Sequence, residues 1–241
     1  MNVETPRRNL TGAMVPALAV AALAGLGALL LVGGQNGGRK AAEAAPIDCI
    51  LENADGVGGP IDLLDGNGAR VTQADFAGQP VVLYFGFAHC PDVCPTSMYA
   101  LAEALAQPGG YDVQAVLITV DPARDTPAVM QAYAGTEGFP QGLIGLSGSI
   151  EQVDAAKRSF QVYAAPAPIE GAPAGDYNVD HSSFLYVLDG QWRTRAIVPT
   201  MRRQAGGDPN SPLAATPPDT IAACIAAGLE RPAPAPASHN P

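Results

Sequence analysis

The sequence predicts one α/β domain in which a mixed sheet is flanked by helices. Two mainly apolar runs rich in β-formers, Val81–Phe87 and Val113–Val120, each fit a strand that is buried on both faces. A helix with apolar residues at helical spacing follows the first run at Pro95–Ala106. The dipeptide Asp189-Gly190 is a hairpin signal between two later β-rich stretches. This order of strands and helices indicates a sheet covered on both sides.

The other elements are justified by local signals. Ile61–Val71 is expected to form an N-terminal hairpin extension, because the residues of Asp65–Gly68 tolerate the positive φ angles of a tight turn. Asp125 or Thr126 can cap a short helix over Pro127–Tyr133, in which proline suits the first turn. The remaining predicted elements are a helix over Ser149–Phe160, strands over Ser183–Leu188 and Arg195–Val198, a final helix over Ile221–Leu229, and surface loops over Ala165–Asp176 and Gln204–Pro218.

The N-terminal part is expected to cross a membrane. Met14–Val32 contains no charged residue, and about 20 apolar residues span the roughly 30 Å hydrocarbon core. We expect residues 1–12 to be cytoplasmic, residues 13–33 to be an uncleaved transmembrane signal anchor, and residues 34–46 to be a flexible linker. Cleavage near Ala42–Ala45, where small residues resemble a peptidase site, is the alternative.

The rest of the chain is placed on the extracytoplasmic side. Arginines before the apolar run favour a cytoplasmic N-terminus, although Arg39 and Lys40 behind it nearly balance them. The cysteines and the single short N-terminal span decide the orientation. We therefore expect residues 47–230 to form a domain in the periplasm, anchored in a bacterial inner membrane, followed by a disordered Pro/Ala-rich tail over residues 231–241.

The composition argues against nucleic acid as a partner. The formal net charge is −10 at pH 7, and nucleic-acid binding depends on Lys and Arg that meet phosphates. Only 15% of the residues are charged, while 47% are hydrophobic, partly because of the apolar N-terminal run. The acidic balance is therefore interpreted as favouring solubility.

The motif Cys90-Pro-Asp-Val-Cys94 lies where a buried strand ends and a helix begins. Pro95 suits the first helical position, so Cys94 is expected at or near the N-cap. Unpaired N–H groups and the helix dipole stabilise a thiolate there. The cysteines are one residue further apart than in a thioredoxin-type redox site, and the wider loop could let both sulfurs meet one ion. The motif alone supports metal binding and dithiol redox chemistry equally.

His181 shifts this balance toward metal binding. It precedes the strand predicted at Ser183–Leu188, which should lie in the same sheet as Val81–Phe87, so the start of that strand can approach the cysteine loop. Two thiolates are soft ligands that suit Cu(I), and an added imidazole gives a set that also holds Cu(II). Zinc could use the same set with water as its fourth ligand.

Three motifs together resemble the Sco/SenC family of copper-binding assembly factors for cytochrome c oxidase. They are GFAHCPDVCPTSM over Gly86–Met98, ITVDPARDTP over Ile118–Pro127, and VDHSSFLYVLD over Val179–Asp189. The resemblance covers roughly Gly58 to Leu229, and it implies a thioredoxin-like fold. Three motifs in this order are a far more specific signal than one cysteine pair.

The resemblance also implies the cargo and its destination. Copper, as Cu(I) or Cu(II), would be carried by Cys90, Cys94 and His181. The protein would deliver that copper to the binuclear copper site of cytochrome c oxidase, or reduce the cysteines of that site. The implied partners are the copper-binding subunit of the oxidase and another copper chaperone.

Three aspartates near the motifs are candidate supporting residues. Asp92, between the cysteines, is either a solvated turn residue or a charge that tunes metal affinity and partner docking. Asp121 and Asp125 either form a turn and helix cap, or orient a ligand. Three other residues are expected to be incidental to the metal: His89, which should point away as its strand ends, Met98, which shares an apolar helix face, and His239 in the tail.

The two remaining cysteines can form a structural disulfide. If Cys90 and Cys94 belong together, Cys49 and Cys224 are left as partners in an oxidising compartment. Cys224 could instead be a small buried apolar residue, because it shares one side of the last predicted helix with Ile221.

Two other functions compete with a metallochaperone. The first is a thiol–disulfide oxidoreductase that uses Cys90 and Cys94 without metal transfer. The second is a peroxiredoxin-like peroxidase, which is the weaker alternative because neither a cysteine pair this close nor His181 serves that chemistry. Whether the chain is an enzyme is left open by the sequence.

Overall fold

A computed structural model describes residues 49–50, 52–108, 111–173, 176–203, 208 and 210–232. The predicted cytoplasmic segment, signal anchor and linker lie outside the described residues, as do residues 233–241 of the tail, including His239. Within the described ranges, no helix is both long enough and apolar enough to span a bilayer.

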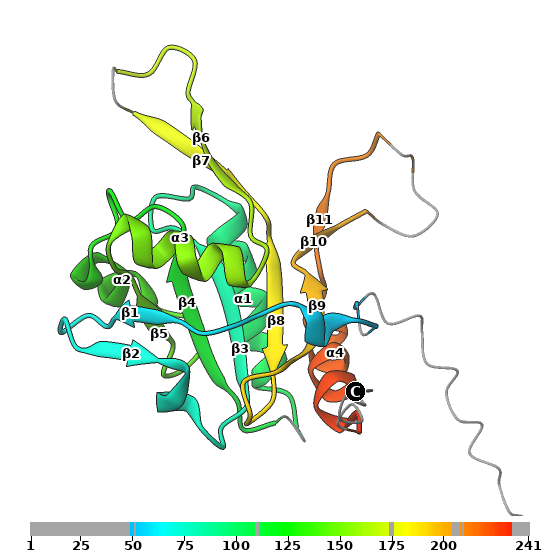
Figure 1. Ribbon diagram of the computed structural model, residues 1–241. Coiled ribbons are helices and arrows are strands. Elements are labelled where there is room, and N and C mark those ends of the chain that lie inside the picture. The colour runs from blue at the N-terminus through cyan, green and yellow to red at the C-terminus, as the bar shows by residue number, and fades with distance from the viewer. Residues whose placement is uncertain are drawn as a thin grey trace, which may run out of the picture. The chain divides into compact units, whose positions relative to one another are not determined.

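A five-stranded mixed sheet forms the centre of the domain (Figure 1). Its strand order is β5-β4-β3-β8-β9. The first three strands are parallel and the last two join antiparallel, so Leu83 of β3 pairs with Val116 of β4 on one side and Tyr186 of β8 on the other. The strands are β3 (Val81–Gly86), β4 (Gln114–Thr119), β5 (Ile144–Leu146), β8 (Phe184–Leu188) and β9 (Thr194–Pro199).

The central strand β3 is covered on both faces, as its sequence predicted. All six of its residues are buried, and the ring of Phe85 packs against Phe160 and Tyr186 with centroid distances of 5.5 and 6.0 Å. Burying large apolar side chains contributes roughly 1.5–3 kcal/mol each. This packing fixes the end of β3, from which the cysteine loop departs.

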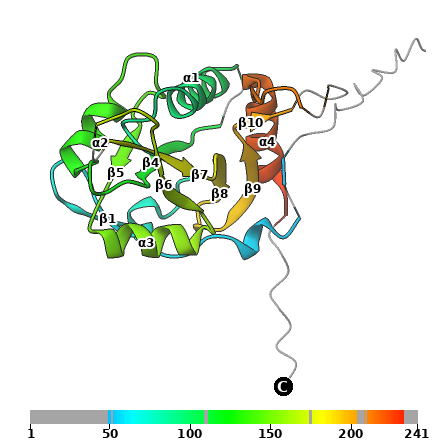
Figure 2. The same ribbon diagram turned by 90° about the horizontal axis from the view of Figure 1, so that it is seen from above.

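Helices lie on both sides of the sheet (Figure 2). One side carries α1 (Val93–Leu105) and α4 (Pro218–Glu230), the other carries α3 (Ile150–Ser159), and α2 (Pro127–Ala134) lies beside β5. Thr126 caps α2 by accepting a hydrogen bond from the Val129 N–H, and Ser149 forms a capping box at the start of α3. The start of α2 matches its predicted signals, and α3 lies within its predicted range.

The first helix begins earlier than expected. The prediction placed Pro95 at the first helical position, whereas α1 starts at Val93, with Asp92 as its N-cap residue. Pro95 is tolerated there because the first four N–H groups of a helix have no partner within the helix. Cys94 therefore lies inside the first turn rather than at the cap.

The N-terminal hairpin is confirmed. Strands β1 (Asp62–Leu64) and β2 (Arg70–Thr72) pair antiparallel, and Gly68 in the turn has a φ of +80°. Asp65 closes the turn by accepting hydrogen bonds from the N–H groups of Asn67 and Ala69. Two short 3-10 helices flank this hairpin, at Ala54–Gly56 and Gln73–Phe76.

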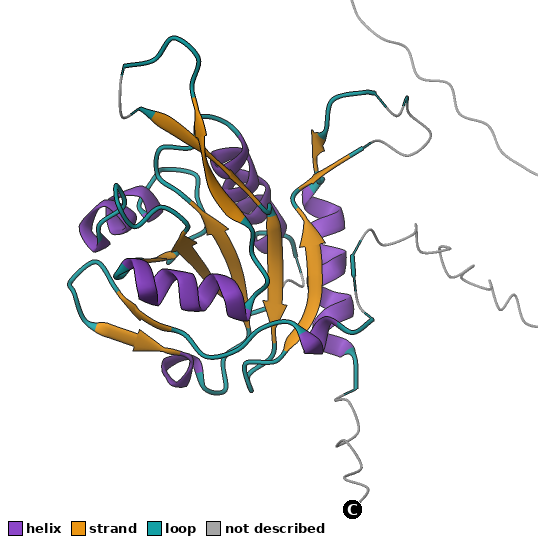
Figure 3. Cartoon of the chain, turned by 45° about the horizontal axis from the view of Figure 1, so that its top comes forward, coloured by secondary structure: helices purple, strands orange, loops and turns teal. Residues whose placement is uncertain are grey.

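The two predicted surface loops are wrong in part, because each contains one strand of a two-stranded arm (Figure 3). Strand β6 (Ala164–Pro168) pairs with β7 (Tyr177–His181), and β10 (Met201–Arg202) pairs with β11 (Ala214–Ala215). Proline is tolerated in edge strands, and both strands of a two-stranded arm are edge strands. The strands inside the predicted loops, β6 and β11, consist of Ala and Pro and lack the β-forming side chains on which the strand predictions relied. The strand β5 was also missed, because a strand of three residues with Gly145 at its centre gives little strand signal.

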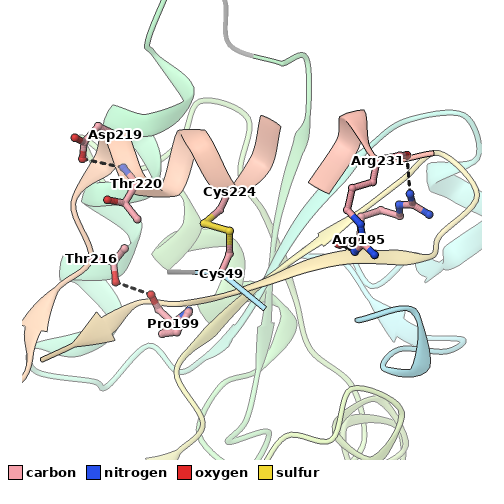
Figure 4. The surroundings of a disulfide bond; sticks show 8 residues. All are labelled: Cys49, Arg195, Pro199, Thr216, Asp219, Thr220, Cys224 and Arg231. Carbon is pink, nitrogen blue, oxygen red and sulfur yellow. Dashed lines mark hydrogen bonds between the residues drawn. A yellow bond between two sulfur atoms is a disulfide. The ribbon is translucent and has the colours of Figure 1, made fainter. Parts of the chain in front are cut away.

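A disulfide joins the start of the described chain to the last helix (Figure 4). Cys49 and Cys224 are bonded, with Cα atoms 5.8 Å apart and 175 positions between them in sequence. Beside the bond, Ile50 and Ile197 exchange two backbone hydrogen bonds of 2.8 and 2.9 Å. The bond therefore ties the segment before β1 to the edge of the sheet and to α4.

Candidate metal centre

The three predicted ligands come from three adjoining elements. Cys90 lies in the loop after β3, Cys94 in the first turn of α1, and His181 at the end of β7. The Cys94 Sγ and His181 Nε2 atoms are 3.5 Å apart. The Cys90 Sγ accepts a hydrogen bond from the Cys94 N–H at 3.3 Å. All three side chains therefore meet where the sheet, the helix and the arm adjoin.

The spacing of Cys94 and His181 fits two donors on one metal ion. A metal bound at about 2.3 Å by sulfur and about 2.0 Å by nitrogen, with a tetrahedral angle between them, holds those atoms about 3.5 Å apart. The described residues contain no group of three or more His, Cys, Asp or Glu side chains already arranged to hold a metal. The distance between Cys94 and His181 is therefore the geometric support for a metal site.

The ring of His181 is held in one orientation. Its Nδ1 atom lies 2.9 Å from the Ser182 carbonyl oxygen, which can only accept, so Nδ1 carries a proton. In the neutral ring Nε2 would then be the free nitrogen, and it lies on the side of Cys94. The rings of Phe87 and Tyr84 pack edge-on against the imidazole, at centroid distances of 5.7 and 6.2 Å. A neutral imidazole with a free Nε2 is the form that binds metals.

The two thiols differ in acidity. A hydrogen bond with the Cys94 side chain, aided by hydrogen bonds from His181 and backbone N–H groups, lowers the pKa of Cys90 to about 4. The thiolate expected at Cys94 from its place at the helix start is wrong for the metal-free protein, because the same Cys90–Cys94 interaction and burial raise the pKa of Cys94 well above its ordinary value. Cys90 is half-buried whereas Cys94 is fully buried. Cys90 is therefore the accessible thiolate of the pair.

This asymmetry predicts how metal-free, reduced protein reacts with iodoacetamide. A thiol with an ordinary pKa near 8.5 reacts about tenfold faster for each pH unit between 6 and 7. Because the pKa of Cys90 is about 4, its thiolate is already formed at pH 6, and its rate should stay nearly flat to pH 8 and fall only as the pH drops toward 4. Mass spectrometry of the alkylated peptide measures this rate.

The Cys94→Ser variant tests the cause of the lowered pKa. Removing the Cys94 thiol should move the rise in Cys90 alkylation to higher pH, because the largest cause of the lowered pKa is lost. A tenfold increase per pH unit between 6 and 7 in the wild type would contradict the assignment.

The surroundings of Cys94 were not predicted from the sequence. The buried Tyr84 hydroxyl lies 3.8 Å from the Cys94 Sγ and 2.9 Å from the Ser183 Oγ. Gly86 leaves room for the sulfur, since a Cβ at this position would lie 3.1 Å from Cys94 Sγ and 2.8 Å from the Tyr84 ring. The signals available in the sequence were Tyr84 and Gly86, which interrupt an otherwise apolar strand.

Asp125 positions the cysteine loop and does not contact a ligand. Its buried carboxylate accepts hydrogen bonds from the Ala88 N–H at 3.0 Å and the Thr119 hydroxyl at 2.7 Å. Ala88 is two residues before Cys90. The helix cap predicted for Asp125 or Thr126 is supplied by Thr126.

Asp121 positions the arm that carries His181. Its carboxylate accepts hydrogen bonds from Arg124 and, at 2.8 Å, from the Tyr177 hydroxyl on β7. The Arg124 guanidinium lies 3.7 Å from the Tyr177 ring centroid and donates to the Tyr177 carbonyl oxygen at 2.8 Å. Sequence reasoning missed Arg124 and Tyr177, because their partners are distant in sequence.

Asp92, His89 and Met98 lie near the cysteines in sequence but differ in exposure. Asp92 is exposed at the N-cap of α1, where its carboxylate accepts a hydrogen bond from the Thr96 hydroxyl. The His89 Nδ1 lies 3.4 Å from Asp125, and this side chain is 52% exposed. Met98 is fully buried in the core, as expected from its helix face.

The fold and the cluster around Cys90, Cys94 and His181 define a thioredoxin-like protein with a dithiol and a histidine at one edge of its sheet. The SCO1/SenC family model matches residues 51–206. The chain therefore belongs to the SCO1/SenC family.

Relatives agree with this assignment. Over 134 residues the chain is 45% identical to the mitochondrial SCO2 homolog of Bos taurus, a match that covers 54% of this chain and 49% of that protein. The mitochondrial SCO1 homolog 1 of Arabidopsis thaliana is 42% identical over 135 residues, covering 55% of this chain and 39% of that protein. The chain thus spans half or less of the length of these curated relatives.

Solved relatives share the fold and contain copper. Copper-bound ScoI of Bradyrhizobium japonicum is 34% identical, and the match covers 72% of this chain and 99% of that one with a TM-score of 0.55. Copper-bound ScoI of Arabidopsis thaliana is 37% identical, covering 59% of this chain and 87% of that one with a TM-score of 0.53.

Proposed function

We propose that this chain is a membrane-anchored metallochaperone that binds copper with Cys90, Cys94 and His181. The observation that carries the proposal is the 3.5 Å approach of Cys94 Sγ to His181 Nε2, next to the thiolate of Cys90. Solved relatives that hold copper support it. Two thiolates and an imidazole suit Cu(I), and they also accept Cu(II).

The proposed destination follows from the family. The protein would deliver copper to, or reduce the cysteines of, the binuclear copper site of cytochrome c oxidase. Its partners would be the copper-binding subunit of that oxidase and another copper chaperone. Residues 13–33 would anchor the chain in a bacterial inner membrane, residues 34–46 would be the linker, and the domain over residues 47–230 would face the periplasm.

A thiol–disulfide oxidoreductase is the second candidate function. The lowered pKa of Cys90 favours it, because thiolates are the attacking species in disulfide exchange. In that case the half-buried Cys90 would attack the target disulfide, and Cys94 would resolve the mixed disulfide. A Cys90–Cys94 disulfide leaves no thiolate for copper, so the two activities alternate at one site.

Metal analysis of purified protein separates the candidates. Reduced wild-type protein, incubated with Cu(I) and freed of excess metal, is expected to retain about one copper per chain, and the Cys90→Ser/Cys94→Ser double variant none. Circular dichroism checks that the variant is folded. Equal copper in both proteins would contradict the proposed ligands. A wild type that retains no copper but reduces a dithiol substrate would favour the second candidate.

A further inference from the structure

A cavity borders the proposed copper site. It has a volume of about 320 Å³ and is lined by Cys90 and His181, but not by Cys94. Met201 of β10 and Leu213, which is 51% exposed, also line it. A copper ion held by the three proposed ligands would therefore face this cavity, and it would enter and leave through it.

Among the side chains that line the cavity, Met201 offers a soft donor beyond the proposed ligands. Asp92 and Asp180 present carboxylates, which as hard oxygen ligands suit Mg²⁺, Ca²⁺ or Mn²⁺. The thioether of Met201 is a soft, uncharged ligand of the kind that selects Cu(I). The lining of the cavity thus combines Cys90 and His181 with a thioether.

The position of Met201 is tied to the segment that carries His181. Thr200, its neighbour, donates a backbone hydrogen bond of 3.0 Å to the Ser183 carbonyl oxygen. The hydroxyls of Thr200 and Ser183 are also hydrogen-bonded. Met201 itself pairs with Ala215 across the short arm. These bonds fix the backbone of Met201 on the side of the sheet where His181 ends β7.

Core packing does not explain Met201. The other described methionines, Met98 and Met130, are fully buried, whereas Met201 is only partly buried. Its side chain borders open space rather than filling a gap between core residues. A leucine at this position would cover the same surface, so the sulfur is the feature that needs a role.

We propose that Met201 is a fourth copper ligand, which binds the ion on the side of the cavity and is the ligand that an acceptor displaces first. This inference rests on the proposed copper-binding function. Thioether binding releases no proton, and the ion remains Cu(I) throughout. Displacement breaks the copper–thioether bond and forms one bond to an incoming donor, while the thiolates keep the charge of the ion balanced.

Copper-edge X-ray absorption of selenomethionine-labelled protein tests the proposal. The protein is loaded with Cu(I) alone, and selenium is detected only where it lies in bonding contact with the copper. We expect a copper–selenium shell in the wild type and in Met130→Leu, and none in Met201→Leu. Competition with a Cu(I) chelator should show an affinity about tenfold lower in Met201→Leu, at the low end of the 10–100-fold range for a residue that tunes a metal site.

The possible results separate this inference from the proposed function. Copper that is bound by sulfur and nitrogen, with no selenium shell in the wild type, overturns the role of Met201 and leaves the three-ligand site intact. A wild type that retains no Cu(I) overturns the proposed function, and the inference with it. A selenium shell that persists in Met201→Leu places the ion beside another methionine and also refutes the proposal.

Discussion

Replacing His181 with alanine is expected to reduce the affinity for copper by more than about 100-fold, beyond the 10–100-fold cost of losing a residue that only orients a ligand. The Nε2 atom of His181 lies 3.5 Å from Cys94 Sγ, and alanine offers no donor in its place. The two thiolates remain, so weak binding of Cu(I) should persist while the Cys₂His set for Cu(II) is lost. Chelator competition measures the affinity, and the sulfur-to-copper charge-transfer band reports the Cu(II) complex.

His89→Ala is the matched control for this experiment. The His89 side chain is 52% exposed and hydrogen-bonded to Asp125, and it does not border the cavity next to Cys90. Its removal should leave the charge-transfer band and the copper affinity nearly unchanged. If both variants lose copper equally, or if His181→Ala keeps the spectrum of the wild type, the assignment of His181 as a ligand is wrong.

Removing the disulfide is expected to lower the free energy of unfolding by about 2–5 kcal/mol. Cys49 and Cys224 enclose a loop of 175 positions, for which the chain-entropy account gives an upper figure of about 5 kcal/mol. The Cys49→Ala/Cys224→Ala double variant removes the bond without leaving a reactive thiol. Urea denaturation followed by circular dichroism measures the difference.

The Cys90→Ala variant is the control for the loss of a cysteine side chain. Cys90 is half-buried and carries no disulfide, so this change should cost much less stability than the double variant. Denaturation curves of the double variant and wild type that coincide under oxidising conditions would show that the bond contributes little. Copper binding by the double variant should survive wherever the domain remains folded.

The part of the fold that rests on continuous apolar runs could be predicted from sequence. β3 and β4 are buried on both faces, and a run such as Val81–Phe87 has few other stable environments. The start of α2 followed from Asp125, Thr126 and Pro127, and Thr126 supplies the cap. The proposed ligand residues were chosen from the Cys90–Cys94 spacing and the place of His181 before a strand, and the structure brings Cys94 and His181 within 3.5 Å.

The parts that sequence did not predict depend on contacts between distant segments. The arm β6–β7 is stabilised where Tyr177 meets Asp121 and Arg124, and no local pattern encodes that contact. The hydrogen bond of Tyr84 with Ser183 joins residues 99 positions apart. The place of Met201 was not predicted either, because no strand was expected at residues 201–202. Sequence patterns report local propensity and burial, whereas these features arise only after the chain has folded.

The three proposed ligands come from two distant parts of the sequence, and this affects newly made chains. Cys90 and Cys94 share one loop, but His181 lies 87 positions beyond Cys94. Under the proposed function, a chain whose sheet has not yet assembled would offer copper only its dithiol, and the imidazole would join after folding. Only a fully folded molecule would then hold copper with all three residues, so copper bound in this way would mark a protein that has completed folding.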